Sequence, residues 1–344
     1  MPLITKLPHL GKAVMDALAR GAPDVDTDNL PNVTDVTADN LTEVVKIINS
    51  QCPDPRLKFL MERLVEHLHD FVRETQLTTE EWMTAIQFLT KTGQICSDKR
   101  QEFILLSDVF GVSSLVDVVN NPKDKDVTGA TESTVLGPFF IEETREIQNG
   151  EAIASDDKGE PMLIRGTVRN TKGEPISNAL LETWETDHDG YYDTQYETYE
   201  VDCRGRLRTD AEGKYLFRAI LPVAYPIPND GTVGGYLRKM NRHVFRPAHL
   251  HLMLLADGYE DLTSCLYFKG DVFLNSDAVF GVKSSLVVEP KIIEDEAEAK
   301  KFGFKKAPFH LVEHDFVLLT EQEAKDIKAK ARKDRGIPEE LPSA

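Results

Sequence analysis

Residues 246–255 read RPAHLHLMLL, and this stretch decides how the second half of the chain is interpreted. Successive side chains of a β-strand point to opposite faces, so the alternate leucines can enter a core while His249 and His251 share the other face. Both imidazoles can then reach one ion. The stretch predicts a strand that is buried on one side and carries two candidate metal ligands, to which others must be added.

Further strands are predicted around it, because from Met162 onward the apolar residues show a period of two. The segment 170–175, NTKGEP, has the composition of a turn between two of them. Many short strands separated by Gly, Pro and Asp turns indicate a β-sandwich. The predicted strands are Met162–Val168, Ala179–Thr186, Lys214–Ile220, Ala248–Leu255, Leu262–Phe268, Lys283–Val288 and His314–Leu319.

Two other histidine pairs are not expected to bind metal. His67 and His69 fall in a predicted helix, where residues two apart point about 200° away from each other. The pattern HLVEH at 310–314 matches the inverted zinc peptidases, which need it on a helix. Strand-forming residues flank it here, so we expect no helix and no zinc site.

The first third of the chain predicts helices instead. Apolar residues from Leu57 to Val72 recur at the three-four spacing that makes one buried stripe on an α-helix. The stripe is longer than a helical layer on a sandwich needs, so we expect a homodimer built on these helices. Its main members are Leu57, Leu60, Leu64, Leu68 and Phe71.

A second helix is predicted to begin at the capping box TTEE, residues 78–81, and to end at Gly93. A third should run from a cap at Asp98 to Gly111, and a short fourth over Ser113–Val119. The inward face of the second helix is expected to hold Trp82, Ile86 and Leu89.

The exposed connection NNPKDKDVTGAT, residues 120–131, marks the expected domain boundary. A second capping box at Thr320–Glu323 opens a charged, solvated helix that should run to Arg335, with Pro338 closing the fold. The predicted fold class is α+β. Its parts are a helical dimerisation domain at 1–131 that contributes one wall of a pocket, a catalytic β-sandwich at 132–320, and a charged helix and tail at 321–344.

Composition limits the partners. The 344 residues carry 40 Lys and Arg against 58 Asp and Glu, and the net charge of −18 repels phosphate backbones and anionic lipids. No apolar stretch approaches the roughly 18 residues of a membrane span, and residues 1–22 lack the apolar core of a signal peptide. Cys52, Cys96, Cys203 and Cys265 show no C-x-x-C spacing and are expected to be free thiols. We expect a cytoplasmic chain that binds neither nucleic acid nor membrane.

Tyrosines are the remaining candidate metal ligands, although a tyrosine taken alone usually packs with its hydroxyl hydrogen-bonded. Three stretches follow in order: WETDHDGYYD at 184–193, LPVAYP at 221–226 and RPAHLH at 246–251. Together they resemble the intradiol ring-cleavage dioxygenases, non-haem iron(III) enzymes that open catechols between the two hydroxyls. The resemblance is anchored in the predicted sandwich and extends to the helical region.

The resemblance implies a ferric site with the ligands Tyr192, Tyr225, His249 and His251. Iron(III) is a hard acid that prefers anionic oxygen, so two tyrosinates suit it. Tyr225 is implied to leave the metal as the diol binds and to carry away a substrate proton. Arg246 is implied to stabilise negative charge on the ring, and the alternative for it is an ordinary salt bridge.

Within this family, YPIPNDG at 225–231 and LNSDAVFGVK at 274–283 look most like the hydroxyquinol 1,2-dioxygenases. A helical N-terminal region is typical of the catechol and hydroxyquinol enzymes. Asp108 could accept a hydrogen bond from the third hydroxyl of 1,2,4-trihydroxybenzene, and the alternative for it is a helix-surface carboxylate. The implied substrate-binding residues are Leu105, Asp108, Val135, Leu136, Gly137, Pro138, Ile227, Pro228, Arg246, Ala278 and Val279.

The expected reaction is cleavage of hydroxyquinol by dioxygen to 3-hydroxy-cis,cis-muconate (maleylacetate). The alternative is cleavage of catechol to cis,cis-muconate. A remote alternative is a non-catalytic prealbumin-like binding module, whose opening resembles residues 166–179. In two departures from the family, Cys265 replaces a frequent glutamine and Leu136 a frequent aromatic residue. Cys265 either tunes the metal site or packs, whereas Leu136 leaves more room, so substituted catechols stay open as substrates. A lipid at the helical interface, as in some relatives, is also left open.

Overall fold

The computed structural model describes residues 11–23, 30–97, 100–123, 129–142, 144–198 and 200–336. They form two compact units that divide between Thr84 and Ala85. The division between the compact units lies earlier in the chain than the domain boundary expected at residue 131. The organisation into three domains stays a prediction. The expected helix cap at Asp98 falls outside the described residues. The charged helix expected to reach Arg335 is confirmed, since it spans Glu321–Asp334 with Arg335 as its C-cap.

The described part of the first unit is helical. α3 begins where Asp54 accepts hydrogen bonds from the backbone N–H groups of Arg56 (2.8 Å) and Leu57 (3.0 Å), and it ends at the left-handed Gln76. The helix predicted over Leu57–Val72 is therefore confirmed. The elements of this unit are α1 (Lys12–Ala19), α2 (Leu41–Asn49), α3 (Pro55–Thr75) and the start of α4 (Thr79–Ile95).

The apolar stripe of α3 is exposed in the first unit. α2 packs on a polar part of α3, where the Thr42 hydroxyl lies 3.0 Å from Nδ1 of His69. No described residue of the first unit covers this face, so burial of the stripe depends on a partner and stays a prediction. The main members, which are 42–53% exposed, are Leu57, Leu60, Leu64, Leu68 and Phe71.

Helix α4 begins at the predicted capping box but does not end where predicted. Oγ1 of Thr78 accepts from the N–H of Glu81 (3.2 Å), and the Glu81 carboxylate accepts from the N–H of Thr78 (2.9 Å). The helix continues to Ile95, so the expected end at Gly93 is wrong. Gly93 serves packing instead, because the Phe103 ring lies 3.5 Å from the position that a Cβ would take there.

The buried face of α4 also differs from the prediction. Trp82, Ile86 and Leu89, expected to face inward, are 41–48% exposed. Thr92, on another face, is fully buried, and its hydroxyl lies 2.8 Å from that of Thr232 in α7 (Thr232–Lys239). Contact with α7 therefore decides which face is buried.

The second unit contains the sheets. Its other described helices are α5 (Glu102–Val109), α6 (Val112–Asn120), α8 (Glu296–Lys301) and α9 (Glu321–Asp334). Its described strands are β1 (Pro161–Asn170), β2 (Leu180–Trp184), β3 (Arg204–Arg208), β4 (Lys214–Ile220), β5 (Tyr225–Pro226), β6 (Phe245–Arg246), β7 (His249–Leu255), β8 (Leu262–Phe268), β9 (Val287–Val288), β10 (Lys291–Ile293), β11 (Phe309–Glu313) and β12 (Phe316–Leu318).

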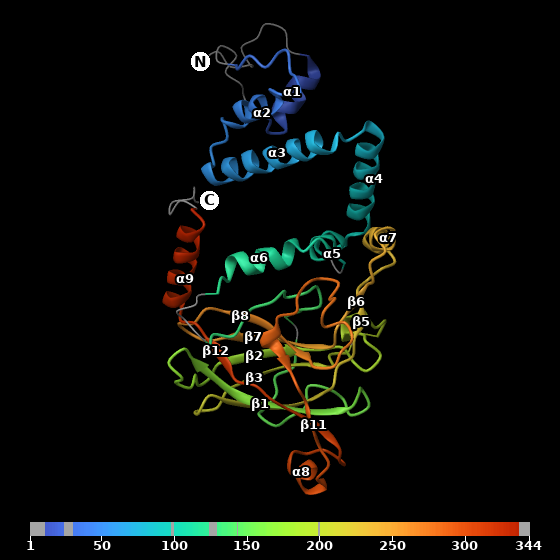
Figure 1. Ribbon diagram of the computed structural model, residues 1–344, viewed down its shortest axis with the longest axis vertical. Coiled ribbons are helices and arrows are strands. Elements are labelled where there is room, and N and C mark those ends of the chain that lie inside the picture. Colours follow the sequence, from blue (N-terminus) through green and yellow to red (C-terminus); the bar gives the residue numbers. More distant parts are fainter. Residues whose placement is uncertain are drawn as a thin grey trace. The chain divides into compact units, whose positions relative to one another are not determined.

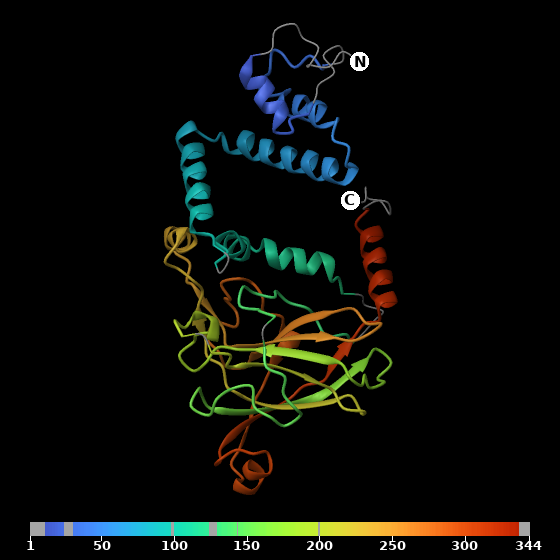
Figure 2. The same cartoon turned by 180° about the vertical axis from the view of Figure 1, so that it is seen from behind.

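Two five-stranded sheets form a β-sandwich (Figure 1). In one sheet, β1 pairs antiparallel with β4 and parallel with β11 and β12, and β10 joins β11. The other sheet has the order β3-β2-β7-β8-β9. Figure 2 shows the layers from behind, with α5 and α6 over the sheet that contains β7 and β8. Helices and mixed sheets together confirm the α+β class.

The core of the sandwich lies between the two sheets. Leu250, Leu252 and Leu254 of β7 are 0% exposed and pack in one cluster with Ile164 of β1 and Phe217 of β4. The alternation in RPAHLHLMLL therefore works as predicted. It leaves the outer face of β7 to His249 and His251.

Five predicted strands are confirmed, and two differ. The predicted strand Lys283–Val288 is a 3₁₀ turn followed by the two-residue β9. The predicted strand His314–Leu319 is reduced to β12, because the Asp315 carboxylate accepts from the N–H of Thr167 (2.7 Å) and interrupts the pairing after β11. The pattern at 310–314 lies largely in β11 and forms no helix, as expected.

The sequence does not predict β3 or α7. The segment RGRLR lacks an alternation of apolar residues, and TVGGYLRK contains two glycines. α9, in contrast, begins at the predicted capping box, where Oγ1 of Thr320 accepts from the N–H of Glu323 (3.2 Å). Among the described residues, no helix is long and apolar enough to cross a membrane. The four cysteines are free thiols.

Candidate active site

Both histidines of β7 lie on the face turned away from the sandwich core. Strand pairing sets their neighbours: His251 lies opposite Trp184 of β2 and Cys265 of β8, and His249 lies opposite Tyr267 of β8. The rings of Trp184 and His251 stack with centroids 4.8 Å apart. All five side chains are at most 2% exposed, so packing fixes both imidazoles away from water.

The two tyrosines reach the same place from different segments. Tyr225 lies on β5, where it pairs directly with Arg246 of β6. Tyr192 follows β2 after a turn at Gly190 (φ +81°). A Cβ on Gly190 would lie 3.2 Å from that of Tyr225, so the absence of a side chain allows the two segments to approach. Both tyrosines are buried.

Four donor atoms converge at this point. The Tyr192 hydroxyl lies 3.3 Å from the Tyr225 hydroxyl and 3.5 Å from Nε2 of His249. Nε2 of His249 lies 3.1 Å from Nε2 of His251. Such separations suit donors that share one cation through bonds of about 2 Å. The structure thus brings the four side chains together, and their role as ligands stays a prediction.

The protonation of these groups also suits a cation. Nδ1 of His249 lies 2.7 Å from the Pro247 carbonyl, which can only accept, so Nδ1 carries the proton and Nε2 presents its lone pair. Burial lowers the pKa of His249 and of His251 well below the ordinary value. Burial also raises the pKa of Tyr192 and of Tyr225. A cation at this point would stabilise the phenolates that burial disfavours.

Arg246 is buried beside this centre. Its Nη1 lies 3.0 Å from Nε2 of His249 and 3.5 Å from the Tyr225 hydroxyl, while its Nε donates to Asp277 (3.1 Å). Burial lowers the pKa of Arg246, but Asp277, through its charge and its hydrogen bond, and the hydroxyls of Tyr225 and Tyr267 together outweigh burial, so the pKa is raised. Arg246 therefore remains a cation. An ordinary salt bridge, the alternative role for Arg246, explains the contact of Nε with Asp277. It does not explain why Nη1 faces His249 and Tyr225.

Sequence reasoning missed the residues that hold the segment around Tyr192. The ring of Phe139 stacks on that of Tyr192 with centroids 4.3 Å apart. Arg204 forms a buried ion pair with Asp193 and donates to the Phe139 carbonyl (3.2 Å). Asp193 is the last residue of the motif WETDHDGYYD, and its place in that motif is the sequence feature that could have marked it as part of the site. Nothing in the local sequence indicates its pairing with Arg204.

Cys265, one of the two departures from the family pattern, contacts a predicted ligand. Its Sγ lies 3.0 Å from Nδ1 of His251. Burial raises the pKa of the Cys265 thiol to about 12, so the thiol is neutral at physiological pH. A proton donated from Nδ1 of His251 to this sulfur would leave Nε2 free to bind a metal.

Several predicted substrate-binding residues gather in one buried apolar cluster. Leu105, Ile227, Ala278 and Val279 belong to it, and Asp108 lies one helical turn after Leu105 on α5. Asp108 is only 6% exposed, so the alternative of a helix-surface carboxylate is wrong. Burial raises the pKa of Asp108, while a hydrogen bond from Ser113 and the charge of Arg246 act in the opposite direction.

The predicted residues at 135–138 are placed differently. Gly137 (φ +75°) lies against His251, whose Cε1 is 3.5 Å from the position of a Cβ on the glycine. Val135 and Pro228 are half-buried, whereas Leu136 and Pro138 are exposed. Gly137 is therefore the member of this segment that touches the centre most directly.

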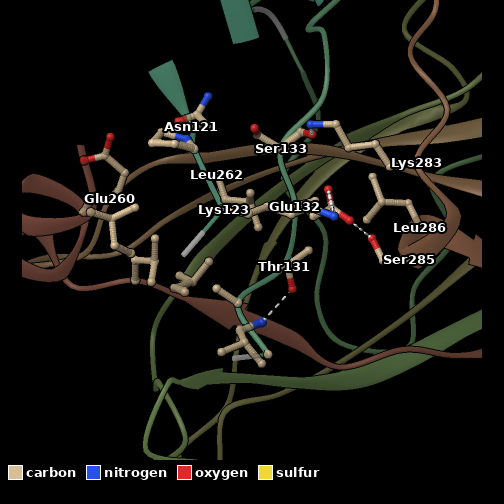
Figure 3. Close-up of a pocket in the computed structure, with 18 of the residues that line it drawn as sticks. Asn121, Lys123, Thr131, Glu132, Ser133, Glu260, Leu262, Lys283, Ser285 and Leu286 are labelled. Atoms are coloured by element: carbon tan, nitrogen blue, oxygen red, sulfur yellow. Dashed lines mark hydrogen bonds and ion pairs between the residues drawn. The ribbon is translucent and has the colours of Figure 1, made fainter. Parts of the chain in front are cut away.

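A cavity of about 480 Å³ lies elsewhere in the second unit and contains none of the predicted site residues (Figure 3). Its lining includes Thr131, Ser133, Leu262 and Leu286. The lysines on its rim are already paired, Lys123 with Glu132, Lys283 with Asp117 and Lys328 with Glu260. Each of these three lysines is neutralised by its carboxylate partner and is not available to bind a ligand. Because the cavity also lacks the predicted site residues, the active site is placed at the tyrosine–histidine centre.

Comparison with known families identifies the fold and the chemistry. Residues 135–318 match the family model described as dioxygenase, and residues 54–128 match the model of the catechol dioxygenase N terminus. An intradiol ring-cleavage dioxygenase of Aspergillus niger is 46% identical to this chain over 306 residues, which is 89% of the chain and 92% of the relative. The chain belongs to the intradiol ring-cleavage dioxygenases.

Other members of this family are also similar. A hydroxyquinol 1,2-dioxygenase of a Rhizobium species is 46% identical over 78% of this chain and 90% of its own length. The crystal structure of hydroxyquinol 1,2-dioxygenase from Pseudomonas putida superposes with a TM-score of 0.76 at 42% identity, covering 83% of this chain and 99% of that one. This intradiol dioxygenase is therefore an oxidoreductase, and the prealbumin-like binding module is ruled out.

Intradiol dioxygenases use non-haem iron. Among the described residues, no cluster of three or more His, Cys, Asp or Glu side chains could hold a metal ion. The tyrosine–histidine centre is different, because half of its donors are phenolic oxygens. Such a donor set suits a hard ferric ion better than zinc.

Proposed function

We propose that this intradiol dioxygenase cleaves hydroxyquinol, 1,2,4-trihydroxybenzene, with incorporation of both atoms of dioxygen, to give 3-hydroxy-cis,cis-muconate (maleylacetate). The observation that carries the choice of substrate is the buried carboxylate of Asp108 beside an apolar cluster and within the field of Arg246. A third hydroxyl can donate a hydrogen bond to this carboxylate, and catechol lacks that group. The similarity to enzymes named hydroxyquinol 1,2-dioxygenase supports the same choice.

The four converging side chains Tyr192, Tyr225, His249 and His251 would hold the ferric ion. When bound, ferric iron would make the chelated diol susceptible to attack by dioxygen. The neutral Nε2 of His249 and the two phenol oxygens supply donors whose charge and hardness suit this ion. Burial of the site excludes bulk water, which strengthens each electrostatic interaction inside it.

Two residues of the chain would act on protons and charge. Tyr225 lies at the edge of the centre, 3.5 Å from the Arg246 guanidinium, so its phenolate can take a proton from the incoming diol. Arg246 remains cationic and presents Nη1 to the centre, where it would stabilise negative charge that develops on the ring. Neither residue needs to move far, because β5 and β6 pair them directly.

Oxygen uptake tests the proposal. The purified protein should contain ferric iron, show the visible absorption of tyrosinate-to-iron charge transfer, and consume oxygen fastest with hydroxyquinol when compared with catechol and protocatechuate. Preference for catechol would replace the substrate by that of a catechol 1,2-dioxygenase and leave the iron site unchanged. A colourless protein active with zinc or iron(II) would overturn the ligand assignment.

We also propose that the chain forms a homodimer through the exposed stripe of α3 and acts in the cytoplasm. The stripe is a continuous apolar face on a 21-residue helix, and faces of this size are usually covered by a partner. A lipid at this interface stays an open alternative for part of the cover. The four free thiols are consistent with a reducing compartment.

A further inference from the structure

Asp277 lies behind Arg246, away from the donor atoms of the centre. Its carboxylate accepts from Nε of Arg246 at 3.1 Å through one oxygen and from Nη2 at 3.3 Å through the other. Both side chains are buried, with 3% of Arg246 and 2% of Asp277 exposed. Two parallel contacts of this kind fix the plane of a guanidinium as well as its position. Nη1 is thereby left to face His249 and Tyr225.

The same carboxylate also fixes the segment that follows it. Its oxygens accept from the backbone N–H groups of Val279 (3.2 Å) and Gly281 (2.9 Å). Gly281 leaves room for this arrangement, because a Cβ there would lie 3.0 Å from Nη2 of Arg246 and 2.9 Å from the Tyr267 hydroxyl. A single side chain therefore sets the position of both the arginine and the loop 277–281.

This loop is part of the wall of the predicted pocket. The carbonyl of Ala278 accepts from Arg242 (3.1 Å), which also donates to the carbonyl of Val109 at the end of α5 (2.8 Å). The hydroxyl of Ser114 on α6 donates to the carbonyl of Val279 (2.9 Å). The loop thus joins Asp277 to α5, the helix that carries Asp108.

We propose that Asp277 is a positioning residue of the reaction: it directs Nη1 of Arg246 toward the centre and sets the pocket wall at Ala278 and Val279. This inference rests on the proposed function, since it assumes that Arg246 stabilises charge on the diol. An Asp277 carboxylate that merely neutralised a buried arginine would need neither the contacts to both guanidinium nitrogens nor those to the loop.

Substitution of Asp277 tests the proposal. Asp277→Asn keeps the size of the side chain but loses one acceptor and the charge, so the guanidinium loses its fixed orientation. We expect kcat with hydroxyquinol to fall about 10- to 100-fold, as for other misplaced electrostatic groups. Iron content and tyrosinate absorption should stay unchanged. The Kd of hydroxyquinol, from anaerobic spectral titration, should rise by a smaller factor than kcat falls, because the lost orientation of Arg246 acts on the transition state and only the shift of the pocket wall acts on binding.

A matched control and a double variant make the result specific. Asp315→Asn removes a carboxylate that likewise joins an arginine, Arg169, to a backbone N–H, that of Thr167, outside the site, and it should leave kcat unchanged. In an Arg246→Lys background, Asp277→Asn should add less than about a threefold loss, because both changes remove the same interaction. Independent, multiplying losses would overturn the proposal.

A second variant covers the case in which Asp277→Asn does not fold. Gly281→Ala keeps the carboxylate but pushes against Arg246 and Tyr267, so it should lower kcat while retaining iron. Full kcat in either folded variant overturns the role of Asp277. If instead the unmodified enzyme lacks iron or takes up no oxygen with any of the diols, the proposed function fails, and this outcome is visible before any variant is made.

Discussion

Helix α3 and strand β7 have equally regular apolar patterns but differ completely in burial. The leucines of β7 at 250, 252 and 254 are 0% exposed, whereas Leu60, Leu64 and Leu68 of α3 are 42%, 49% and 53% exposed. Strand β7 is covered by the sheet that contains β1 and β4, which belongs to the same chain. For α3, none of the described residues of its own unit supplies such a cover.

The difference shows what an apolar pattern can and cannot say. Periodicity identifies the face that avoids water, because it follows from the geometry of one helix or strand. It does not identify the partner, which for α3 we propose to be a second copy of the chain. Variants in the two regions should therefore affect different properties, metal and unfolding in the sandwich and assembly in the helical unit.

The largest effect is expected at the outer face of β7. His249→Ala should lose most of the bound iron and reduce turnover to background, because three donors remain where four are needed. Tyr225→Phe should retain part of the iron but lose about 10²- to 10⁴-fold in kcat, the contribution of a proton-transfer group. Metal analysis and oxygen uptake measure both effects. Equal metal loss in the two variants would contradict the distinct role of Tyr225. A change of oligomeric state in either variant would contradict the view that assembly depends on the helical unit and not on the sandwich.

The next largest effect compares the two apolar faces directly. Leu252→Ala in the sandwich core should lower the free energy of unfolding by about 2–5 kcal/mol, the cost of a cavity at a fully buried leucine. Leu64→Ala on α3 should change that free energy much less at low protein concentration but raise the dissociation constant of the dimer. Denaturant titration and sedimentation measure the two quantities. If the unmodified protein is a monomer at micromolar concentration, the proposal that a second copy of the chain covers the stripe of α3 is wrong.

A smaller effect is expected on selectivity. Asp108→Ala should reduce kcat/KM for hydroxyquinol by about 1–3 kcal/mol and change the value for catechol little, because only the former substrate loses a hydrogen bond. Steady-state kinetics with both diols measure this difference. Equal losses for the two substrates would indicate that Asp108 supports the pocket wall and does not recognise the third hydroxyl.

The smallest effect concerns the pH dependence of stability. Glu185 is buried in the sandwich, and burial raises its pKa well above the ordinary value. As the pH rises above the ordinary value, the unfolded chain releases this proton while the folded one keeps it, so stability falls. Glu185→Gln keeps the acceptor for the N–H of Ile220 and should remove this loss, so that its Tm exceeds that of the unmodified protein more at pH 8 than at pH 5.

A carboxylate in the helical unit, Glu66, is expected to change stability with pH in the opposite direction. A hydrogen bond from Lys46 lowers the pKa of Glu66, so this carboxylate adds stability that is present at neutral pH and lost as the pH falls through the lowered pKa. Glu66→Gln should therefore cost stability at neutral pH and nothing in acid. Thermal unfolding of both variants across this range measures the contrast, and parallel pH profiles would refute it.

Features that depend on near neighbours along the chain could be predicted from the residues alone. The alternation in β7, the stripe of α3 and the capping boxes at Thr78 and Thr320 follow from local geometry, and each forms the element it predicts. The family motifs also named Tyr192, Tyr225, His249 and His251 as a set, which the structure brings together at 3.1–3.5 Å.

Contacts between distant segments could not be predicted in this way, because they form only when the chain folds. Pairing of β2, β7 and β8 places Trp184 and Cys265 on either side of His251, and packing against α7 turns Thr92 of α4 inward in place of Trp82. Asp277 meets Arg246 from 31 residues away. These contacts depend on strand register and on which surfaces meet. A one-residue shift of register would change the neighbours of His251 without altering any local pattern.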